Sequence, residues 1–153
     1  KMKRILLSCF AVVLLCSCAE EPAKTHSAEQ KTYQIFKRYL KKQDLEQQIS
    51  PSANQWVVIP AEGCGFCIRK ATELYDTQPW LQTQFITNKA SDHCSKSDFI
   101  CDGDKSFLNR LNLGNQYKPT VLQVTDSLHI NIFYIGAENW KEAYKKVKAF
   151  DKG

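Results

Sequence analysis

The sequence lacks two features that would place it in a special class of protein. It has no apolar run long enough to span a bilayer comfortably, because the run at residues 5–15 is short and includes Ser8. It has no internal repeat at the periods of solenoid proteins. The 153 residues are otherwise ordinary, with 43% hydrophobic and 24% charged residues. These properties predict one globular domain with a little extra chain, able to bury its own core.

A strong excess of charge is also missing. The full chain has 21 basic and 16 acidic residues, a net charge of +5. Three of the basic residues are Lys1, Lys3 and Arg4, and without them 18 basic residues face 16 acidic ones, a net charge of +2. Nothing in this balance indicates a nucleic acid partner.

The first eighteen residues have the layout of an export signal. A basic start is followed by the apolar run at 5–15, which is typical of a signal-peptide core. Leu15-Cys16-Ser17-Cys18 then resembles a bacterial lipobox, although Cys16 is unusual there. The resemblance implies that Cys18 is lipidated and becomes the mature N-terminus, whereas the alternative is an ordinary signal peptide cleaved nearby. We expect a lipoprotein signal over 1–18, a flexible tether over 19–29 and a domain over 30–153.

The chain has seven cysteines, and their number in the domain is even. Two would leave with the signal and Cys18 would carry the lipid. The four that remain are Cys64, Cys67, Cys94 and Cys101. An even number of thiols in an exported protein indicates two disulfides, although the sequence alone allows three pairings.

Hydrophobic periodicity predicts an α/β domain that begins with an amphipathic helix. Apolar residues from Tyr33 to Leu40 recur at helical spacing within residues 30–49. Asn139 and Glu142 have the spacing of a capping box before the last helix. The other expected elements are a buried strand at 55–62, a helix from Cys67, a strand at 83–89, a polar loop at 90–104, a helix from Asp104 to Gly114, a hairpin at 118–136 with its turn at Asp126-Ser127, and a helix at 140–150.

Two motifs fall at related positions in this order. Cys64-Gly65-Phe66-Cys67 follows the first strand and opens a helix, and Lys118-Pro119-Thr120 opens the hairpin. Together they resemble the thioredoxin superfamily over residues 50–151. The resemblance implies a thioredoxin-like three-layer α/β fold, β-α-β and then β-β-α around a central mixed sheet, with an extra N-terminal helix.

The cysteine spacing suits thiol–disulfide exchange. Residues i and i+3 are neighbours in the first turn of a helix, so the two sulfurs can bond to each other. Cys64 would lie at the helix N-terminus, where backbone amides and the helix dipole stabilise a thiolate. We expect Cys64 to be the nucleophile and the more buried Cys67 to be the resolving thiol. This chemistry uses the two thiols alone, and we expect neither a cofactor nor a metal.

Two further residues are expected to bind the substrate. Phe66 offers an apolar contact to an unfolded or extended chain. The resemblance assigns Pro119 to the proline that faces the cysteine pair, and it implies a cis bond between Lys118 and Pro119. That arrangement would leave backbone groups free to pair with an extended substrate. The alternative is a trans proline at a strand start.

Three positions depart from thioredoxin. Gly63 stands where the family has a tryptophan, Val58 stands near the family's buried acid, and the Gly-Phe pair is closer to the Gly-Tyr of periplasmic disulfide isomerases. The sequence therefore does not determine the reduction potential of the Cys64–Cys67 pair. Glu62 is the nearest carboxylate and a weak candidate for proton transfer, and Lys70 is expected on the helix surface.

Cys94 and Cys101 lie outside the family motif. They could form a structural disulfide that holds the polar loop, a second redox pair, or a ligand set together with His93. We favour the structural disulfide, because the residues between them include few apolar ones and no helix N-terminus is expected there. His129 is expected to be an ordinary strand residue.

Three classes of function follow. The leading hypothesis is a thiol–disulfide oxidoreductase, lipid-anchored in a bacterial cell envelope, that acts on exported proteins or a redox partner protein. The first alternative is a copper or zinc protein that uses both cysteine pairs and His93 on the same fold, although Cys94 and Cys101 do not make a second CxxC. The second alternative is a non-catalytic interaction module whose CxxC is only a stable disulfide.

Overall fold

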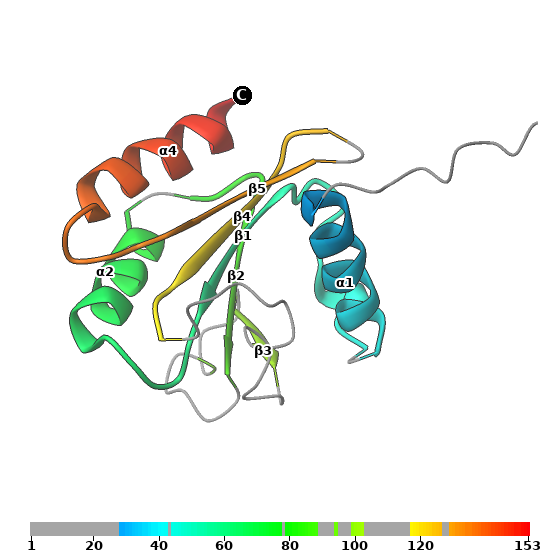
Figure 1. Ribbon diagram of the computed structural model, residues 1–153, viewed down its shortest axis with the longest axis horizontal. Coiled ribbons are helices and arrows are strands. Elements are labelled where there is room, and N and C mark those ends of the chain that lie inside the picture. Colours follow the sequence, from blue (N-terminus) through cyan, green and yellow to red (C-terminus); the bar gives the residue numbers. More distant parts are fainter. Residues whose placement is uncertain are drawn as a thin grey trace, which may run out of the picture.

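The computed structural model describes residues 28–42, 44–77, 79–88, 94, 99–102, 117–126 and 129–153. They form a five-stranded sheet with α1 on one face and α2 and α4 on the other (Figure 1). In chain order the elements are α1 (Ala28–Lys42), a 3₁₀ turn (Glu46–Gln48), β1 (Gln55–Ile59), α2 (Gly65–Tyr75), β2 (Thr83–Asn88), β3 (Phe99–Asp102), β4 (Thr120–Val124), β5 (Ile130–Tyr134) and α4 (Trp140–Lys152). None of the helices within these ranges is long and apolar enough to cross a bilayer.

The sheet is mixed, with strand order β3-β2-β1-β4-β5. β1 pairs in parallel with β2, and β2 pairs in parallel with β3. β4 runs antiparallel to both β1 and β5. The segments β1-α2-β2 and β4-β5-α4 therefore form the two halves of a thioredoxin-like fold, and the predicted fold class is confirmed.

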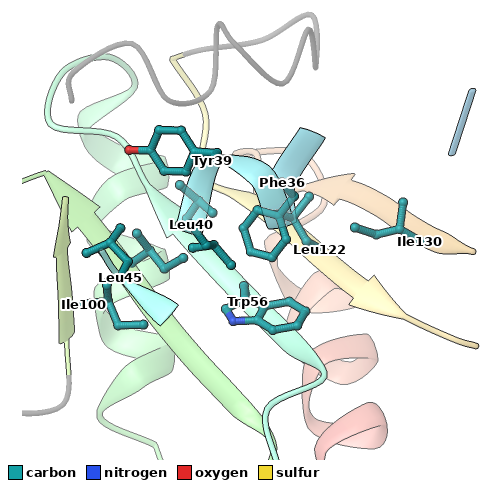
Figure 2. Close-up of a cluster of buried hydrophobic side chains, with 10 residues drawn as sticks. Phe36, Tyr39, Leu40, Leu45, Trp56, Ile100, Leu122 and Ile130 are labelled. Atoms are coloured by element: carbon teal, nitrogen blue, oxygen red, sulfur yellow. The ribbon is translucent and has the colours of Figure 1, made fainter. Parts of the chain in front are cut away.

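Helix α1 covers one face of the sheet because its apolar stripe meets the side chains that point to that face. Phe36, Tyr39 and Leu40 are buried there (Figure 2). The rings of Phe36 and Trp56 lie edge to face, with centroids 4.9 Å apart. The helix begins at Ala28, inside the range expected to be a tether.

The same helix ends earlier than its hydrophobic pattern predicts. Asp44 has a φ of 53°, in the left-handed region that closes many helices. The N–H of Leu45 donates to the carbonyl of Leu40 at 3.0 Å, and the N–H of Asp44 donates to the carbonyl of Lys41 at 3.3 Å. This pair of bonds forms a Schellman motif, so the expected continuous helix over 30–49 is wrong.

The other face of the sheet is covered by α2 and α4. Ala71 and Leu74 of α2 and Ala143 and Val147 of α4 pack with strand side chains such as Val57 in a second buried cluster. Successive strand residues alternate between the two clusters, since Val57 belongs to one and Val58 to the other. The packing fixes where α2 begins, and hence where the first cysteine lies.

Strand β3 lies inside a segment that we expected to be a polar loop. Phe99 and Ile100 are both buried, one in each core cluster. This short strand pairs with β2, with Thr87 opposite Cys101. The loop prediction for 90–104 is therefore wrong at 99–102, because two adjacent apolar residues suffice to form an edge strand. The helix expected from Asp104 to Gly114 lies outside the described residues.

Asn139 precedes α4 as predicted, but it does not form the expected capping box. Its side chain makes no bond to the helix backbone. Instead its Oδ1 accepts from the N–H of Gly136 at 2.7 Å, and its Nδ2 donates to the carbonyl of Tyr134 at 2.9 Å. The asparagine therefore holds the turn between β5 and α4, and the two bonds within that turn replace the cap.

Candidate redox site

Cys64 is the N-cap residue of α2. Its backbone is extended, with a φ of −65° and a ψ of 93°, and the helix begins at the next residue. The Cys64 Sγ accepts a hydrogen bond from the N–H of Cys67 at 3.2 Å. An N-cap side chain faces backbone N–H groups that have no partner inside the helix, so the sulfur lies where negative charge is favoured.

Cys67 lies one turn further along α2 and is bonded to Cys64 as a disulfide. The two α-carbons are 5.2 Å apart. Cys67 is only 1% exposed, whereas Cys64 is partly exposed. The two sulfurs therefore differ in access: a large partner reaches Cys64 first.

The segment before β4 is held against the residues before the first cysteine. The N–H of Cys64 donates to the carbonyl of Tyr117 at 3.0 Å. Gly63 has a φ of 133°, and a Cβ at that position would lie 2.4 Å from the same carbonyl oxygen. Only glycine therefore fits between these two segments.

Phe66 lies between the two cysteines, and cationic groups cover part of its ring. The ring is 5.5 Å from the Arg69 guanidinium carbon and 5.7 Å from the Lys70 Nζ. Phe66 nevertheless remains 36% exposed, and among the described residues no atom lies within 4 Å of where a Cβ on Gly65 would be. Phe66 is therefore an exposed ring in the residue pair between the cysteines, and its contact with a substrate stays a prediction.

Lys70 is not the surface residue that we expected. Its side chain is 19% exposed and its Nζ lies 4.5 Å from the ring centroid of Trp140. The same Nζ contacts the Glu73 Oε2 at 2.5 Å, and the Lys70 carbonyl accepts from the Tyr144 hydroxyl. Lys70 therefore ties α2 to α4, because a cation packs well against an aromatic face.

The Tyr144 hydroxyl lies within this contact between the helices. Burial raises the pKa of Tyr144 to about 12, and the nearby Glu73 carboxylate adds to the shift. The hydroxyl consequently stays protonated and remains a donor at any ordinary pH.

Pro119 is buried directly before β4, and its carbonyl accepts from the N–H of Ile135 at 2.9 Å. The described residues contain no cis peptide bond. The expected cis bond between Lys118 and Pro119 is therefore wrong for this structure, in which the proline occupies a strand start in the trans form. Its proposed contact with substrate stays a prediction.

Lys118 is paired with a carboxylate. Its Nζ contacts the Glu138 Oε1 at 3.1 Å. A hydrogen bond to its own backbone and the bond to Lys118 lower the pKa of Glu138.

Neither position considered for proton transfer holds a buried acid. Glu62, the weak candidate, is exposed, and Val58 is buried in the hydrophobic cluster between α1 and the sheet. The described part of the site therefore places a valine at the position expected for the buried acid.

Cys94 and Cys101 form the other disulfide, with α-carbons 5.6 Å apart. Cys101 follows Ile100 in β3, at the end of the sheet from which α2 also departs. His93 lies outside the described residues. Within those residues, no group of three or more His, Cys, Asp or Glu side chains is arranged to hold a metal. In this state the four sulfurs are bonded in pairs.

His129 is not the strand residue that we expected. It directly precedes β5 and is exposed in the hairpin turn, where its backbone N–H and Nδ1 both contact the Asp126 Oδ1 at 2.9 Å. This arrangement stabilises the turn, and the histidine lies at the end of the sheet where β1 begins, opposite the end from which α2 departs.

Sequence reasoning missed Tyr117 and the contacts of Trp140 and Tyr144. The only signal for Tyr117 was the glycine at position 63. The reason for a glycine there becomes clear only in the folded chain, where the backbone of Tyr117 leaves no room for a side chain at that position. Trp140 and Tyr144 pack on the inner face of the last helix, and the sequence pattern does not reveal that Lys70 contacts both of them.

Comparison with known proteins adds no assignment. No protein-family model matches the chain, and neither the curated proteins nor the solved structures contain a significant match. The class of protein is therefore defined by the mixed α/β fold and the CxxC disulfide alone, which are both compatible with thioredoxin-like proteins.

Proposed function

We propose that the protein is a member of the thioredoxin superfamily and works as a thiol–disulfide oxidoreductase through Cys64 and Cys67. The observation that carries this proposal is the difference between the two sulfurs. Cys64 is accessible and accepts a backbone N–H at the start of α2, whereas Cys67 is 1% exposed behind it. A stable structural disulfide has no need of this asymmetry, but a nucleophile and a resolving thiol do.

The exchange passes two electrons and two protons. In the reducing direction, the Cys64 thiolate attacks a substrate disulfide and forms a mixed disulfide, and one substrate sulfur leaves and takes up a proton. The Cys67 thiol loses its proton and attacks the Cys64 sulfur, which releases the second substrate thiol. Run backwards from the disulfide seen in this structure, the same steps oxidise a substrate dithiol. The Cys67 N–H and the helix dipole stabilise negative charge on Cys64 in both directions.

We further propose that the substrates are exported proteins or a redox partner protein, and that Cys18 anchors the enzyme to a membrane of the bacterial cell envelope. Support for this location comes from the basic start, the apolar run and the lipobox-like Leu15-Cys16-Ser17-Cys18. An envelope location also suits a domain whose four cysteines pair as disulfides.

A disulfide-reduction assay tests the activity. The protein should accelerate the reduction of insulin by dithiothreitol, and Cys64→Ser should abolish the acceleration because no mixed disulfide can form. A Cys94→Ser, Cys101→Ser double variant is the matched control and should retain most of the activity. Full activity without Cys64, or no acceleration by the wild type, would contradict the proposed function.

A further inference from the structure

We propose that the outward side of α1 is a membrane-docking surface, which binds the anionic headgroups of the bilayer that holds the lipid anchor. The docking surface consists of Ile35, Lys37, Arg38, Lys41 and Lys42. Such docking rests on the anchor proposed for Cys18, because the anchor brings α1 to the bilayer. The anchor alone leaves the domain free to turn, whereas a second contact through α1 fixes its orientation.

Positive charge is concentrated in α1. Its 15 residues include five basic ones and one acidic one, a net charge of +4. The chain after Cys18 has 18 basic and 16 acidic residues, a net charge of +2. The part of that chain outside α1 therefore has 13 basic and 15 acidic residues, a net charge of −2. A nearly neutral chain thus contains one strongly basic helix.

The fold turns this charge outward. The side of α1 that contains Phe36 and Leu40 packs against the sheet, and the four cations of the docking surface are all exposed. At 3.6 residues per turn, these four positions fall within about 140° around the helix axis. Ile35 lies beside Lys42 on the same side and is 37% exposed. Cations with an exposed apolar side chain suit a bilayer, because the cations meet the headgroups and the apolar group enters between them.

The four cations have no carboxylate partner within the described residues. The ion pairs found there lie on α2, on α4, in the hairpin turn and before β4. Asp44 and Glu46 follow α1 in the chain, but neither forms an ion pair with it within this part of the protein. Lys37 lies over the ring of Tyr33, with its Nζ 5.2 Å from the ring centroid. The charges of this surface are therefore available to an anionic partner.

The position of the anchor favours a bilayer as that partner. Ala28, the first residue of α1, comes ten residues after Cys18. Ten residues span at most about 36 Å, so a lipid on Cys18 holds α1 close to the headgroups. A tethered surface needs only weak attraction, because its effective concentration at the bilayer is high. A soluble anionic partner has no such advantage.

Docking through α1 leaves the cysteine pair accessible. Helix α1 covers one face of the sheet, and α2 and α4 cover the other (Figure 1). Cys64 caps α2. A bilayer beneath α1 therefore lies across the sheet from the helix that carries the cysteines, and Cys64 can meet partners outside the membrane.

Helix α4 offers a matched control on the opposite face of the sheet. It has five lysines and two acidic residues, a net charge of +3. Glu142 pairs with Lys146 at 2.8 Å, whereas Lys141, Lys145 and Lys152 are exposed. A general attraction of lysines to lipid would involve both helices, but docking through one face involves α1 alone.

Acetylation of lysines on vesicles tests the docking surface. The lipidated full chain from bacterial membranes is reconstituted into vesicles of phosphatidylcholine alone, or of equal parts of phosphatidylcholine and phosphatidylglycerol. Mass spectrometry then measures how fast Lys37 and Lys148, a lysine of α4, are acetylated. Lys37 should react about fivefold or more slowly on the anionic vesicles, with Lys148 unchanged. Salt at about 1 M should remove the difference, because it shortens the Debye length to about 3 Å.

Two triple variants isolate the contribution of α1. Arg38→Gln, Lys41→Gln, Lys42→Gln keeps Lys37 as the reporter and should lose its protection, since each cation near an anionic surface strengthens binding about fivefold. Lys141→Gln, Lys145→Gln, Lys152→Gln removes the same charge from α4 and should keep the protection of Lys37. Loss of protection in both variants would assign the effect to net charge and overturn the docking surface.

Flotation of the vesicles separates this inference from the proposed function. Protein that floats with phosphatidylcholine vesicles has its anchor. If Lys37 then reacts equally on both kinds of vesicle, or Lys148 is protected equally, the docking surface is refuted and the anchor stands. Flotation with the anionic vesicles alone would refute the anchor and support the docking surface, and flotation with neither would refute both. The insulin assay judges the oxidoreductase activity in every case.

Discussion

Cys64 and Cys67 carry the same functional group in different surroundings. The first caps α2 and is partly exposed, and the second lies in the helix and is buried. The sequence alone predicts this difference, because a CxxC that follows a buried strand places its first cysteine at a helix start. What it does not predict is the hydrogen bond from Cys64 to Tyr117, which joins residues far apart in the chain.

The different surroundings predict an order of alkylation. After mild reduction, Cys64 should react first with iodoacetamide at neutral pH, because its thiolate is both stabilised and accessible. Peptide mass spectrometry of the partly labelled protein measures the order. Faster labelling of Cys67 would reverse the assignment of nucleophile and resolving thiol.

Gly63 and Gly65 offer a matched pair of substitutions. Gly63→Ala should lower the free energy of unfolding by about 1–2 kcal/mol or more, because φ is 133° and the added methyl group meets the Tyr117 carbonyl. Gly65→Ala lies in α2 with space around it and should be neutral or stabilising by up to about 1 kcal/mol. Urea denaturation measures the free energy of unfolding of both variants. Equal stability of the two variants would show that the segments around Gly63 and Tyr117 move apart at little cost.

At the scale of elements, the predictions from sequence succeeded where the pattern was long and failed where it was short. The stripes of α1 and α4 and the apolar run of β1 were evident because burial repeats at a fixed period over many residues. Strand β3 was missed because its inward-facing residues, Phe99 and Ile100, lie within a polar segment. The early end of α1 was missed because an aspartate, and not a glycine, adopts the left-handed conformation.

The contact between α2 and α4 makes a prediction about pH. The Tyr144 hydroxyl donates to the Lys70 carbonyl, and the pKa of Tyr144 in the folded protein is about 12. In the unfolded chain a tyrosine ionises near 10. The raised pKa therefore stabilises the fold fully below pH 10, and this contribution is lost as the pH rises from 10 towards 12.

Tyr144→Phe isolates this effect. At pH 8 the wild type should exceed the variant by about 0.5–1.5 kcal/mol in free energy of unfolding, the usual contribution of one hydrogen bond. The difference should shrink between pH 10 and 12, since only the wild type has this group to ionise. Chemical denaturation of the two proteins in parallel measures it. A difference that stays constant up to pH 12 would show that the hydroxyl is not held in the buried bond.

For the whole molecule, the fold follows from the order of elements, but the redox direction does not. The thioredoxin-like topology could be predicted because β-α-β and β-β-α patterns agree with the positions of CxxC and Pro119. The direction depends on how strongly the folded protein favours the thiolate over the disulfide, and Gly63, Val58 and Phe66 all depart from the better-known thioredoxin pattern.

Attachment to a membrane is expected to depend on one residue. Cys18→Ala should abolish labelling of the full chain by a radioactive or clickable fatty acid in bacteria, because Cys18 is the last residue of the lipobox-like sequence, the position that carries the lipid. Cys16→Ala is the matched control and should still be labelled. Equal labelling of the Cys18 variant would contradict the proposed anchor.

The reduction potentials of the two disulfides test the central claim most directly. The protein would be equilibrated in thiol–disulfide buffers of known potential, alkylated and mapped by mass spectrometry, so that each pair is read separately. Cys64–Cys67 is expected between about −270 and −120 mV, the range of catalytic couples, and Cys94–Cys101 below about −300 mV, as for structural disulfides. A potential below about −300 mV for Cys64–Cys67 would make it a structural crosslink and contradict the proposed oxidoreductase.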